Sequence, residues 1–293
     1  MFKRLALFAL VIFSQDAFSQ DQNTDSVLLV KTKWERQKIA PKAKLFTYHF
    51  NKKNLFASNQ YLSYIEVKPH HKSPIIAIGN EIKVKKTTAT FGIENQAIAA
   101  VNGTFFDVAN GGSVDFVKVD GQVTNLNVLD KNGNRTRHQM AAIVIDEGRL
   151  ALKKWENTAN WENTLSAKDV MVSGPMLIFN KGTEVLDTTA FTRSRHPRTA
   201  IGLKQNGNVI LLTADGRQEN AAGLSLHELA KIMRWMGCIN VINLDGGGST
   251  TLWVSGYGEN GVVNFPSDNK KWDHEGARKV ANVILLKPRD KKR

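Results

Sequence analysis

Short apolar runs separated by glycine-containing turns dominate the pattern from residue 61 onward. Segments such as YLSYIEV, IIAIGN and AIAAVN have the length and alternation of β-strands. Three pairs that end in glycine predict turns of the antiparallel hairpin type: Asp120-Gly121, Asn132-Gly133 and Glu147-Gly148. The stretch QNGN at 205–208 predicts a further hairpin between the apolar runs on either side of it.

One segment, LSLHELAKIMRWMG, has the periodicity of an amphipathic helix. Ser225 and Glu228 have the spacing of a capping box, and Gly237 is placed to end the helix. Apolar residues recur on one face: Leu226, Leu229, Met233 and Met236. Glu228 could also serve as a general acid, but its distance from Ser225 along the chain favours the capping role.

Many strands and few helices, without strict alternation, predict an α+β fold. We expect a mixed, mainly antiparallel sheet with a few packed helices. No strong linker interrupts residues 61–287, which we interpret as one domain. The polar, lysine-rich residues 20–60 form an N-terminal extension, either a lead-in segment or edge strands, and residues 288–293 form a basic tail.

The first 19 residues have the pattern of an export signal. Lys3 and Arg4 precede the apolar run Leu5–Phe13, and Ser19 provides a small residue near the expected cleavage point. The run is too short to cross a bilayer, and no later stretch is long and apolar enough. We therefore expect a bacterial periplasmic or secreted protein without stable membrane insertion after cleavage. The lone Cys238 excludes an internal disulfide and fits a small buried residue.

The formal net charge of +13 favours anionic partners. Export argues against nucleic acid and favours anionic glycans, phosphoglycans or lipid head groups. An alternative for most of the lysines, including those in the tail, is that they simply solvate the surface.

Polar residues follow several of the expected strands, and glycine accompanies each of them. These positions are Asn102-Gly103, Gly174-Pro175, Asp215-Gly216-Arg217 and Asp245 with three glycines after it. Side chains at strand ends can converge on a pocket, although each pair alone is also a common turn. Arginines crowd into TRSRHPRTA, and their planar guanidinium groups suit phosphate or carboxylate. The pattern predicts an anion site bordered by carboxylates.

Familiar catalytic motifs are absent from the sequence. It contains no GxxxxGK[ST], no GxSxG, no HExxH and no Cys/His cluster with zinc spacing. We expect no metal site and no cofactor. A hard cation held by Asp215, Asp245 or Asp107 together with carbonyl oxygens is an open alternative.

Seven motifs in order resemble those of the phosphodiester glycosidase family, which includes bacterial exopolysaccharide-related proteins. They are NGTFF at 102–106, SGPML at 173–177, RHPRTAIG at 195–202, TADGR at 213–217, GLSLHELA at 223–230, NLDGGGST at 243–250 and RKVANVILL at 278–286. The resemblance covers residues 64–287. The usual family form of the first motif is NGGFF, and Thr104 replaces its second glycine here.

The resemblance implies an enzyme that hydrolyses the bond between a sugar's anomeric carbon and an esterified phosphate. The substrate is then a sugar phosphate or phosphoglycan. We expect Asp245 as the catalytic carboxylate, nucleophile or base, with Asp215 as its partner. The expected substrate-binding residues are Asn102, Arg198, Arg217, Gly246, Gly247, Gly248, Ser249 and Thr250. The alternatives are a non-catalytic anionic-glycan-binding protein and a metal-dependent phosphodiesterase that cuts the P–O bond.

Overall fold

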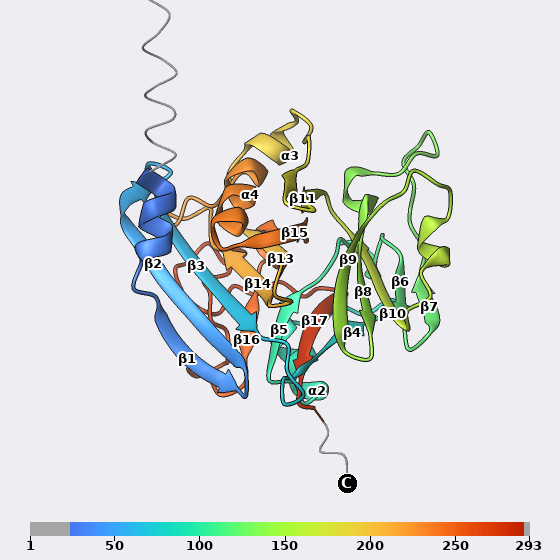
Figure 1. The fold of residues 1–293 in the computed structure, drawn as a ribbon, viewed down its shortest axis with the longest axis horizontal. Helices are drawn as coiled ribbons and strands as arrows, with labels where there is room; N and C mark the ends of the chain where they lie inside the picture. The colour runs from blue at the N-terminus through green and yellow to red at the C-terminus, as the bar shows by residue number, and fades with distance from the viewer. Residues whose placement is uncertain (1–23, 290–293) are drawn as a thin grey trace, which may run out of the picture.

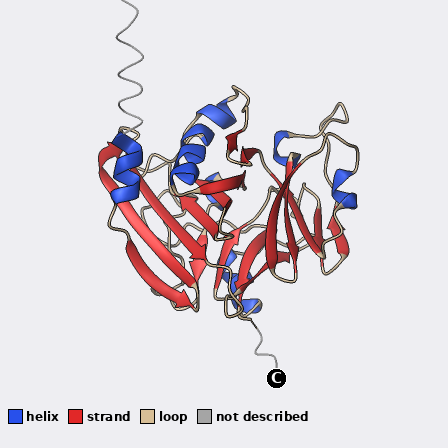
Figure 2. Cartoon of the chain, in the orientation of Figure 1, coloured by secondary structure: helices blue, strands red, loops and turns tan. Residues whose placement is uncertain are grey.

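The computed structural model describes residues 24–289 of the chain and confirms the α+β class. Three antiparallel sheets make up most of it, and a few short helices lie on their outer faces (Figures 1 and 2). The expected signal peptide lies outside the described residues. Within residues 24–289, no helix combines the length and apolar character needed to span a bilayer.

The largest sheet has eight strands and includes the segment expected to precede the domain. Its order is β1 (Glu35–Ala40), β2 (Ala43–Leu55), β3 (Ser58–Val67), β14 (Val209–Ala214), β13 (Arg198–Lys204), β15 (Cys238–Asn243), β11 (Met176–Phe179) and β12 (Gly182–Thr183). Residue 61 lies inside β3, which pairs with β2 on one side and β14 on the other. Residues 35–60 thus supply the strands at one edge of this sheet.

Two smaller sheets and the helices complete the fold. The five-stranded sheet is ordered β7 (Gln122–Asn125), β6 (Val117–Val119), β10 (Asp169–Ser173), β8 (Ala141–Asp146) and β9 (Arg149–Lys154). The four-stranded sheet is ordered β16 (Leu252–Val254), β5 (Ala99–Asn102), β17 (Asn282–Lys287) and β4 (Ile75–Asn80). The helices are α2 (Thr88–Glu94), α3 (Ala190–Arg193) and α4 (Leu226–Trp235), with short 3-10 turns η1 (Arg137–Gln139), η2 (Trp161–Thr164) and η3 (Gly247–Ser249). Residues 24–31 are also helical.

Local turn chemistry accounts for most of the hairpins. Asp120-Gly121 joins β6 to β7, Glu147-Gly148 joins β8 to β9, and 205–208 joins β13 to β14, as predicted. The pair Asn132-Gly133 also forms a turn, but it lies in a loop between β7 and η1 and joins no strands. Asp130 explains the difference, because its carboxylate accepts the backbone N–H groups of Asn132 and Asn134 and closes the loop on itself.

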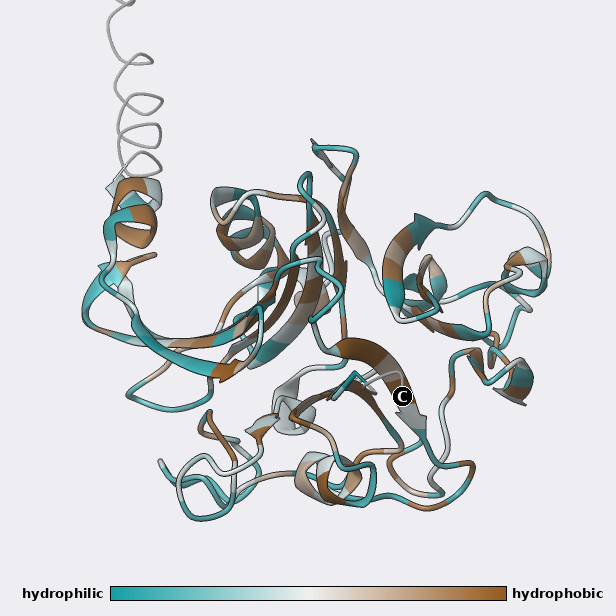
Figure 3. Ribbon diagram, turned by 60° about the horizontal axis from the view of Figure 1, so that its bottom comes forward, coloured by the Kyte–Doolittle hydropathy of each residue, from teal (hydrophilic) through white to brown (hydrophobic). Residues whose placement is uncertain are grey.

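A shared core of buried aliphatic side chains joins the three sheets. Leu45 and Ile65 from the large sheet, Ile143 from the five-stranded sheet and Val101 from the four-stranded sheet belong to one cluster. Figure 3 shows the corresponding hydrophobic ribbon along the central strands. Full burial of each such side chain stabilises the fold by about 1.5–3 kcal/mol.

Helix α4 covers the other face of the large sheet and begins as the sequence predicts. Ser225 Oγ accepts the N–H of Glu228, and the Glu228 carboxylate accepts the N–H of Ser225. Gly237 follows the helix with a φ of +87°, which glycine adopts without strain. Glu228 also pairs with Arg195, so its carboxylate is engaged in capping and in an ion pair.

Strand pairing explains why distant polar segments meet. Arg198 at the start of β13 lies opposite Ala214 at the end of β14, and Ala200 lies opposite Asn243 at the end of β15. The beginning of β13 and the ends of its two neighbours therefore share one edge of the sheet. The N–H of Asp245 binds the carbonyl of Gly103, which brings the end of β5 to the same edge.

Candidate active site

A cavity of about 220 Å³ opens at this edge. It lies over the loop that follows β15. Its walls come from α3, the start of β13, the loop after β14, the triple-glycine loop and the segment before β17. The lining residues are Phe191, His196, Arg198, Arg217, Asp245, Gly246, Gly247, Gly248 and Arg278.

The three glycines are needed because the loop lies tightly against its neighbours. A Cβ on Gly246 would lie 2.7 Å from the carbonyl oxygen of Pro197, and one on Gly248 would overlap the carboxylate of Asp268. Gly247 has a φ of +61° and lies against the guanidinium group of Arg217. The N–H of Gly246 binds Asp245 Oδ1 at 2.9 Å, and that of Gly247 binds Pro197 O at 2.8 Å. Two of the three N–H groups are thus engaged within the protein.

Asp245 is the carboxylate that reaches the cavity. It follows β15 by two residues and is partly exposed. Burial raises the pKa of Asp245 to about 6, although the hydroxyl of Ser249, the N–H of Gly246 and the positive charge of Arg278 act in the opposite direction. The group is therefore ionised in most molecules at neutral pH and takes up a proton in mildly acidic solution.

Arg198 and Arg217 present cations to the cavity in different ways. Arg198 is buried, and its guanidinium donates to the carbonyls of Leu224 at 2.9 Å, Phe191 at 2.5 Å and Ser194 at 3.1 Å. Burial, with a contribution from Arg217, lowers the pKa of Arg198 to about 10. Arg217 is exposed and makes no ion pair with the part of the chain that the structure describes. Neither charge is cancelled by a neighbouring carboxylate.

Three residues that were not among the predicted site residues also line the cavity: Phe191 from α3 and two titratable residues, Arg278 and His196. Arg278 forms a two-point ion pair with Asp268, with N–O distances of 2.7 and 2.8 Å. His196 lies beside both arginines, and its burial together with the charges of Arg198 and Arg217 lowers its pKa, which favours the neutral imidazole. Both belong to motifs noted in the sequence, RKVANVILL and TRSRHPRTA, but nothing in their spacing distinguishes them from their neighbours.

The cavity therefore has a positive charge. Three arginines face it, whereas Asp268 neutralises Arg278 and Asp245 is the carboxylate that lines it. An arrangement of this kind binds an anion and places one carboxylate beside it.

Four of the predicted site residues do not line the cavity. Asp215 is fully buried, and its two oxygens accept Asn264 Nδ2 at 2.7 Å and the N–H of Phe265 at 3.0 Å. Burial raises the pKa of Asp215 to about 7. Asn102 donates to the backbone carbonyl of Asp245 at 2.7 Å. These two side chains are thus engaged with the protein, and their roles toward substrate stay predictions.

Ser249 and Thr250 lie in the layer beneath the glycine loop. Both are completely buried. The Ser249 hydroxyl interacts with the Asp245 carboxylate and lowers its pKa, and Thr250 Oγ1 lies 3.4 Å from Thr199 Oγ1. Of the ten predicted residues, the cavity is lined by Asp245, Arg198, Arg217 and the three glycines.

A buried acidic group lies behind the cavity, and no motif indicated it. Asp115 accepts Thr104 Oγ1 at 2.6 Å, and its other oxygen lies 2.6 Å from His138 Nδ1. Thr104 is the residue that replaces a glycine of the family motif, so its hydroxyl adds a hydrogen bond to this carboxyl group. The charge of Asp115 contributes to raising the pKa of Asp245. Sequence spacing could not reveal it, because Thr104 and Asp115 lie in the loop between β5 and β6, whereas His138 comes from the separate turn η1.

Residues 24–289 contain no cluster of three or more His, Cys, Asp or Glu side chains able to hold a metal ion. Asp107, one of the residues considered for a cation, instead accepts the N–H groups of Ala109 and Asn110 in a tight turn. The titratable side chains that line the cavity are arginines, a histidine and a carboxylate.

Comparisons with known proteins agree with this arrangement. A family model described as phosphodiester glycosidase matches residues 95–287. Human N-acetylglucosamine-1-phosphodiester alpha-N-acetylglucosaminidase is 40% identical over 92 residues, which is 30% of this chain and 16% of that protein. The SPbeta prophage-derived protein YomE of Bacillus subtilis is 36% identical over 74 residues, 25% of this chain and 12% of that protein. The matched parts thus span less than a fifth of these relatives.

Solved structures share the fold over a longer part of the chain. The catalytic domain of the zebrafish N-acetylglucosamine-1-phosphodiester alpha-N-acetylglucosaminidase, auto-inhibited by its pro-peptide, aligns with a TM-score of 0.63 at 20% identity. The alignment covers 92% of this chain and 93% of that one. A hypothetical protein from Synechocystis aligns with a TM-score of 0.63 at 15% identity and covers 88% of this chain and 64% of that one.

Proposed function

We propose that this chain, which belongs to the phosphodiester glycosidase family, is a hydrolase of sugar-1-phosphodiesters. It cleaves the bond between the anomeric carbon of a sugar and a phosphate that is esterified to a second alcohol. The observation that carries the proposal is the cavity itself, where the carboxylate of Asp245 faces the same space as the guanidinium groups of Arg198 and Arg217.

The roles of the cavity residues follow from the chemistry of the substrate. A phosphate monoester is a stable leaving group, so the enzyme's tasks are to hold the phosphate and to support positive charge that develops on the sugar ring. Arg198 and Arg217 perform the first task, and Arg278 adds a third cation whose orientation Asp268 fixes. Asp245 performs the second, as nucleophile or as the base that activates water.

Buried polar groups hold these side chains in place. Asn102 binds the backbone of Asp245, and its Oδ1 accepts Thr199 Oγ1 and the N–H of Thr251. Asp215 anchors Asn264 and Phe265 in the loop that leads towards Arg278. We assign positioning roles to Asn102 and Asp215 because their polar side-chain atoms are bonded to the protein.

The substrate is an exported glycan or glycoconjugate of a bacterium, such as an exopolysaccharide, in the periplasm or outside the cell. The pattern of residues 1–19 and the positive charge of the chain support this compartment and an anionic substrate.

The test uses a sugar-1-phosphate methyl diester or a UDP-sugar and measures released sugar. Asp245→Asn should lower kcat by at least about a thousandfold without changing the melting temperature. Asp146→Asn is the matched control, because Asp146 is exposed at the end of β8, and it should keep full activity.

Two results would overturn the proposal. Saturable binding of the diester without turnover would indicate a glycan-binding protein. Hydrolysis in oxygen-18 water would place the label in the sugar if the C–O bond breaks, so label found in the phosphate would indicate a phosphodiesterase.

A further inference from the structure

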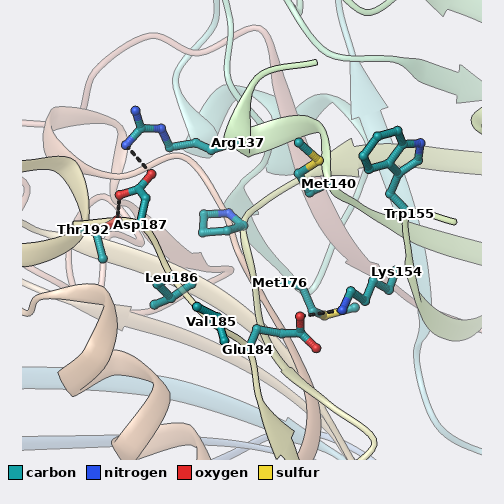
Figure 4. A pocket seen from close by; sticks show the side chains of 11 residues that line it. Arg137, Met140, Lys154, Trp155, Met176, Glu184, Val185, Leu186, Asp187 and Thr192 are labelled. Carbon is teal, nitrogen blue, oxygen red and sulfur yellow. Dashed lines mark hydrogen bonds and ion pairs between the residues drawn. The ribbon is translucent and has the colours of Figure 1, made fainter. Parts of the chain in front are cut away.

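A second cavity, of about 310 Å³, lies beside the first. It is bordered by η1 and the segment that leads into α3, together with residues from β9 and β11 (Figure 4). The catalytic residues assigned above do not line it. Its apolar wall consists of Met140, Trp155, Pro175, Met176, Val185 and Leu186.

The wall of this cavity suits an apolar ligand. The indole N–H of Trp155 already donates to the carbonyl of Thr158 at 2.9 Å. A ligand can therefore contact Trp155 only through the apolar carbon atoms of its ring. Arg135 lies 5.3 Å from the Trp155 ring centroid and helps hold that ring in place. Met140, which directly follows η1, and Met176 from β11 add flexible apolar surface.

The charged side chains of the cavity are paired with each other. Arg137 Nη1 lies 3.0 Å from Asp187 Oδ2, and Lys154 Nζ lies 2.6 Å from Glu184 Oε2 (Figure 4). The positive and negative charges of each pair cancel, so this cavity has no excess positive charge to select an anion, unlike the first cavity. A neutral ligand group fits it best.

Helix α3 borders both cavities. The ring of Phe191 lines the first cavity, and Thr192, the next residue of α3, lines the second. The guanidinium carbon of Arg137 lies 5.2 Å from the Phe191 ring centroid, and that of Arg198 lies 5.0 Å from the same centroid. The two guanidinium carbons, one at each cavity, are therefore no further apart than these distances added together, so the two cavities are close neighbours on either side of α3.

We propose that the second cavity binds the alcohol on the far side of the phosphate, and that this alcohol has a neutral, apolar or aromatic body. The proposal rests on the proposed function, because it assigns the second half of the same diester. Trp155 is then a specificity-determining residue, since an aromatic face favours a ring or other flat apolar group packed against it.

The experiment compares a benzyl with a methyl diester of the same sugar 1-phosphate. The wild-type kcat/KM should be at least roughly tenfold higher for the benzyl diester, which buries a ring that the methyl diester lacks. Trp155→Ala should reduce this ratio towards one and leave the methyl diester unaffected, whereas Trp155→Phe should retain most of it. Leu126→Ala, which changes an exposed apolar side chain outside both cavities, should keep the wild-type ratio.

Leu186→Glu provides a second variant in case Trp155→Ala fails to fold. Leu186 is partly exposed in a loop, and a carboxylate there should abolish the preference by placing an unpaired charge in the neutral cavity. A benzyl-to-methyl ratio near one in the wild type would overturn the inference while the proposed function stands. A diester with a neutral hexose as the far-side alcohol that is preferred over the benzyl diester would overturn it too.

Calorimetric binding of benzyl phosphate and methyl phosphate separates this inference from the proposed function, because it requires no turnover. Tighter binding of benzyl phosphate by the wild type, lost in Trp155→Ala, supports the second cavity even if neither diester is hydrolysed. Equal affinity for the two phosphates overturns it.

Discussion

Replacing Asp215 by asparagine tests the assignment of this residue most directly. Asp215 is fully buried, and burial raises its pKa from 3.8 to about 7 even though Asn264 and Phe265 donate hydrogen bonds to it. Asparagine keeps the shape and one acceptor oxygen but never ionises. The substitution therefore removes the cost of charging a buried carboxyl group.

The size and sign of the effect follow from the pKa. A shift of roughly three units corresponds to about 4 kcal/mol of unfolding free energy, at about 1.4 kcal/mol per unit. Because the folded-state pKa of Asp215 lies above the unfolded one, the folded state binds the proton more tightly. The stabilisation is complete below pH 4 and is lost as the pH rises through 7. Roughly 2–3 kcal/mol of this loss falls between pH 5 and pH 8.

Urea denaturation at pH 5 and pH 8 measures this difference. The wild type should lose roughly 2–3 kcal/mol more than Asp215→Asn between the two pH values. Asp245, whose pKa is raised to about 6, contributes to the slope of both proteins equally and cancels in the comparison. The exposed Asp146→Asn control should follow the wild type. Equal slopes for wild type and Asp215→Asn would refute the burial argument.

Activity of the same variant decides between the two roles of Asp215. If the residue positions the loop at Asn264, Asp215→Asn should keep kcat within about tenfold of the wild type, because the asparagine oxygen still accepts one hydrogen bond. A loss of a thousandfold or more with unchanged KM would instead restore the catalytic partnership that the sequence predicts.

Three further predictions concern the first cavity. The kcat/KM of the wild type should fall about tenfold per pH unit below pH 6, measured from pH 4.5 to 8, because protonation removes the carboxylate of Asp245; a flat profile would contradict its role. Gly248→Ala should lower kcat/KM by at least about a hundredfold, because the added methyl group overlaps Asp268 and disturbs its pair with Arg278. Arg217→Met should raise KM by about tenfold or more and should weaken the inhibition by added salt, since it removes an exposed cation; an unchanged KM would place the phosphate elsewhere.

The sequence predicts those parts of the fold that local chemistry determines. The capping box at Ser225 and Glu228 and the hairpin at 205–208 each depend on residues a few positions apart, and both were predicted correctly. The pairing of β3 with β14 joins segments about 150 residues apart along the chain and has no local signature. For the same reason, the sequence could not show that residues 35–60 extend the main sheet.

The candidate site shows the same limit more sharply. Asp215 and Asp245 both follow a buried strand and precede glycine, so their local patterns are alike. What separates them is the neighbour that each carboxylate meets: Asn264 and Phe265 occupy both oxygens of Asp215, whereas Asp245 faces a cavity. Those neighbours come from other parts of the chain, and only the folded structure identifies them.

The electrostatic balance around Asp245 also arises from long-range contacts. Burial and the buried Asp115 raise its pKa, whereas the Ser249 hydroxyl, the Gly246 N–H and Arg278 lower it. Arg278 can act on Asp245 because Asp268 orients its guanidinium group, and Gly248 leaves the space in which the two meet. The triple-glycine loop therefore does more than provide a flexible turn. Its missing side chains leave room for the Arg278–Asp268 pair, and the charge of Arg278 then acts with the Ser249 hydroxyl and the Gly246 N–H to favour the ionised form of Asp245, which can act as nucleophile or base.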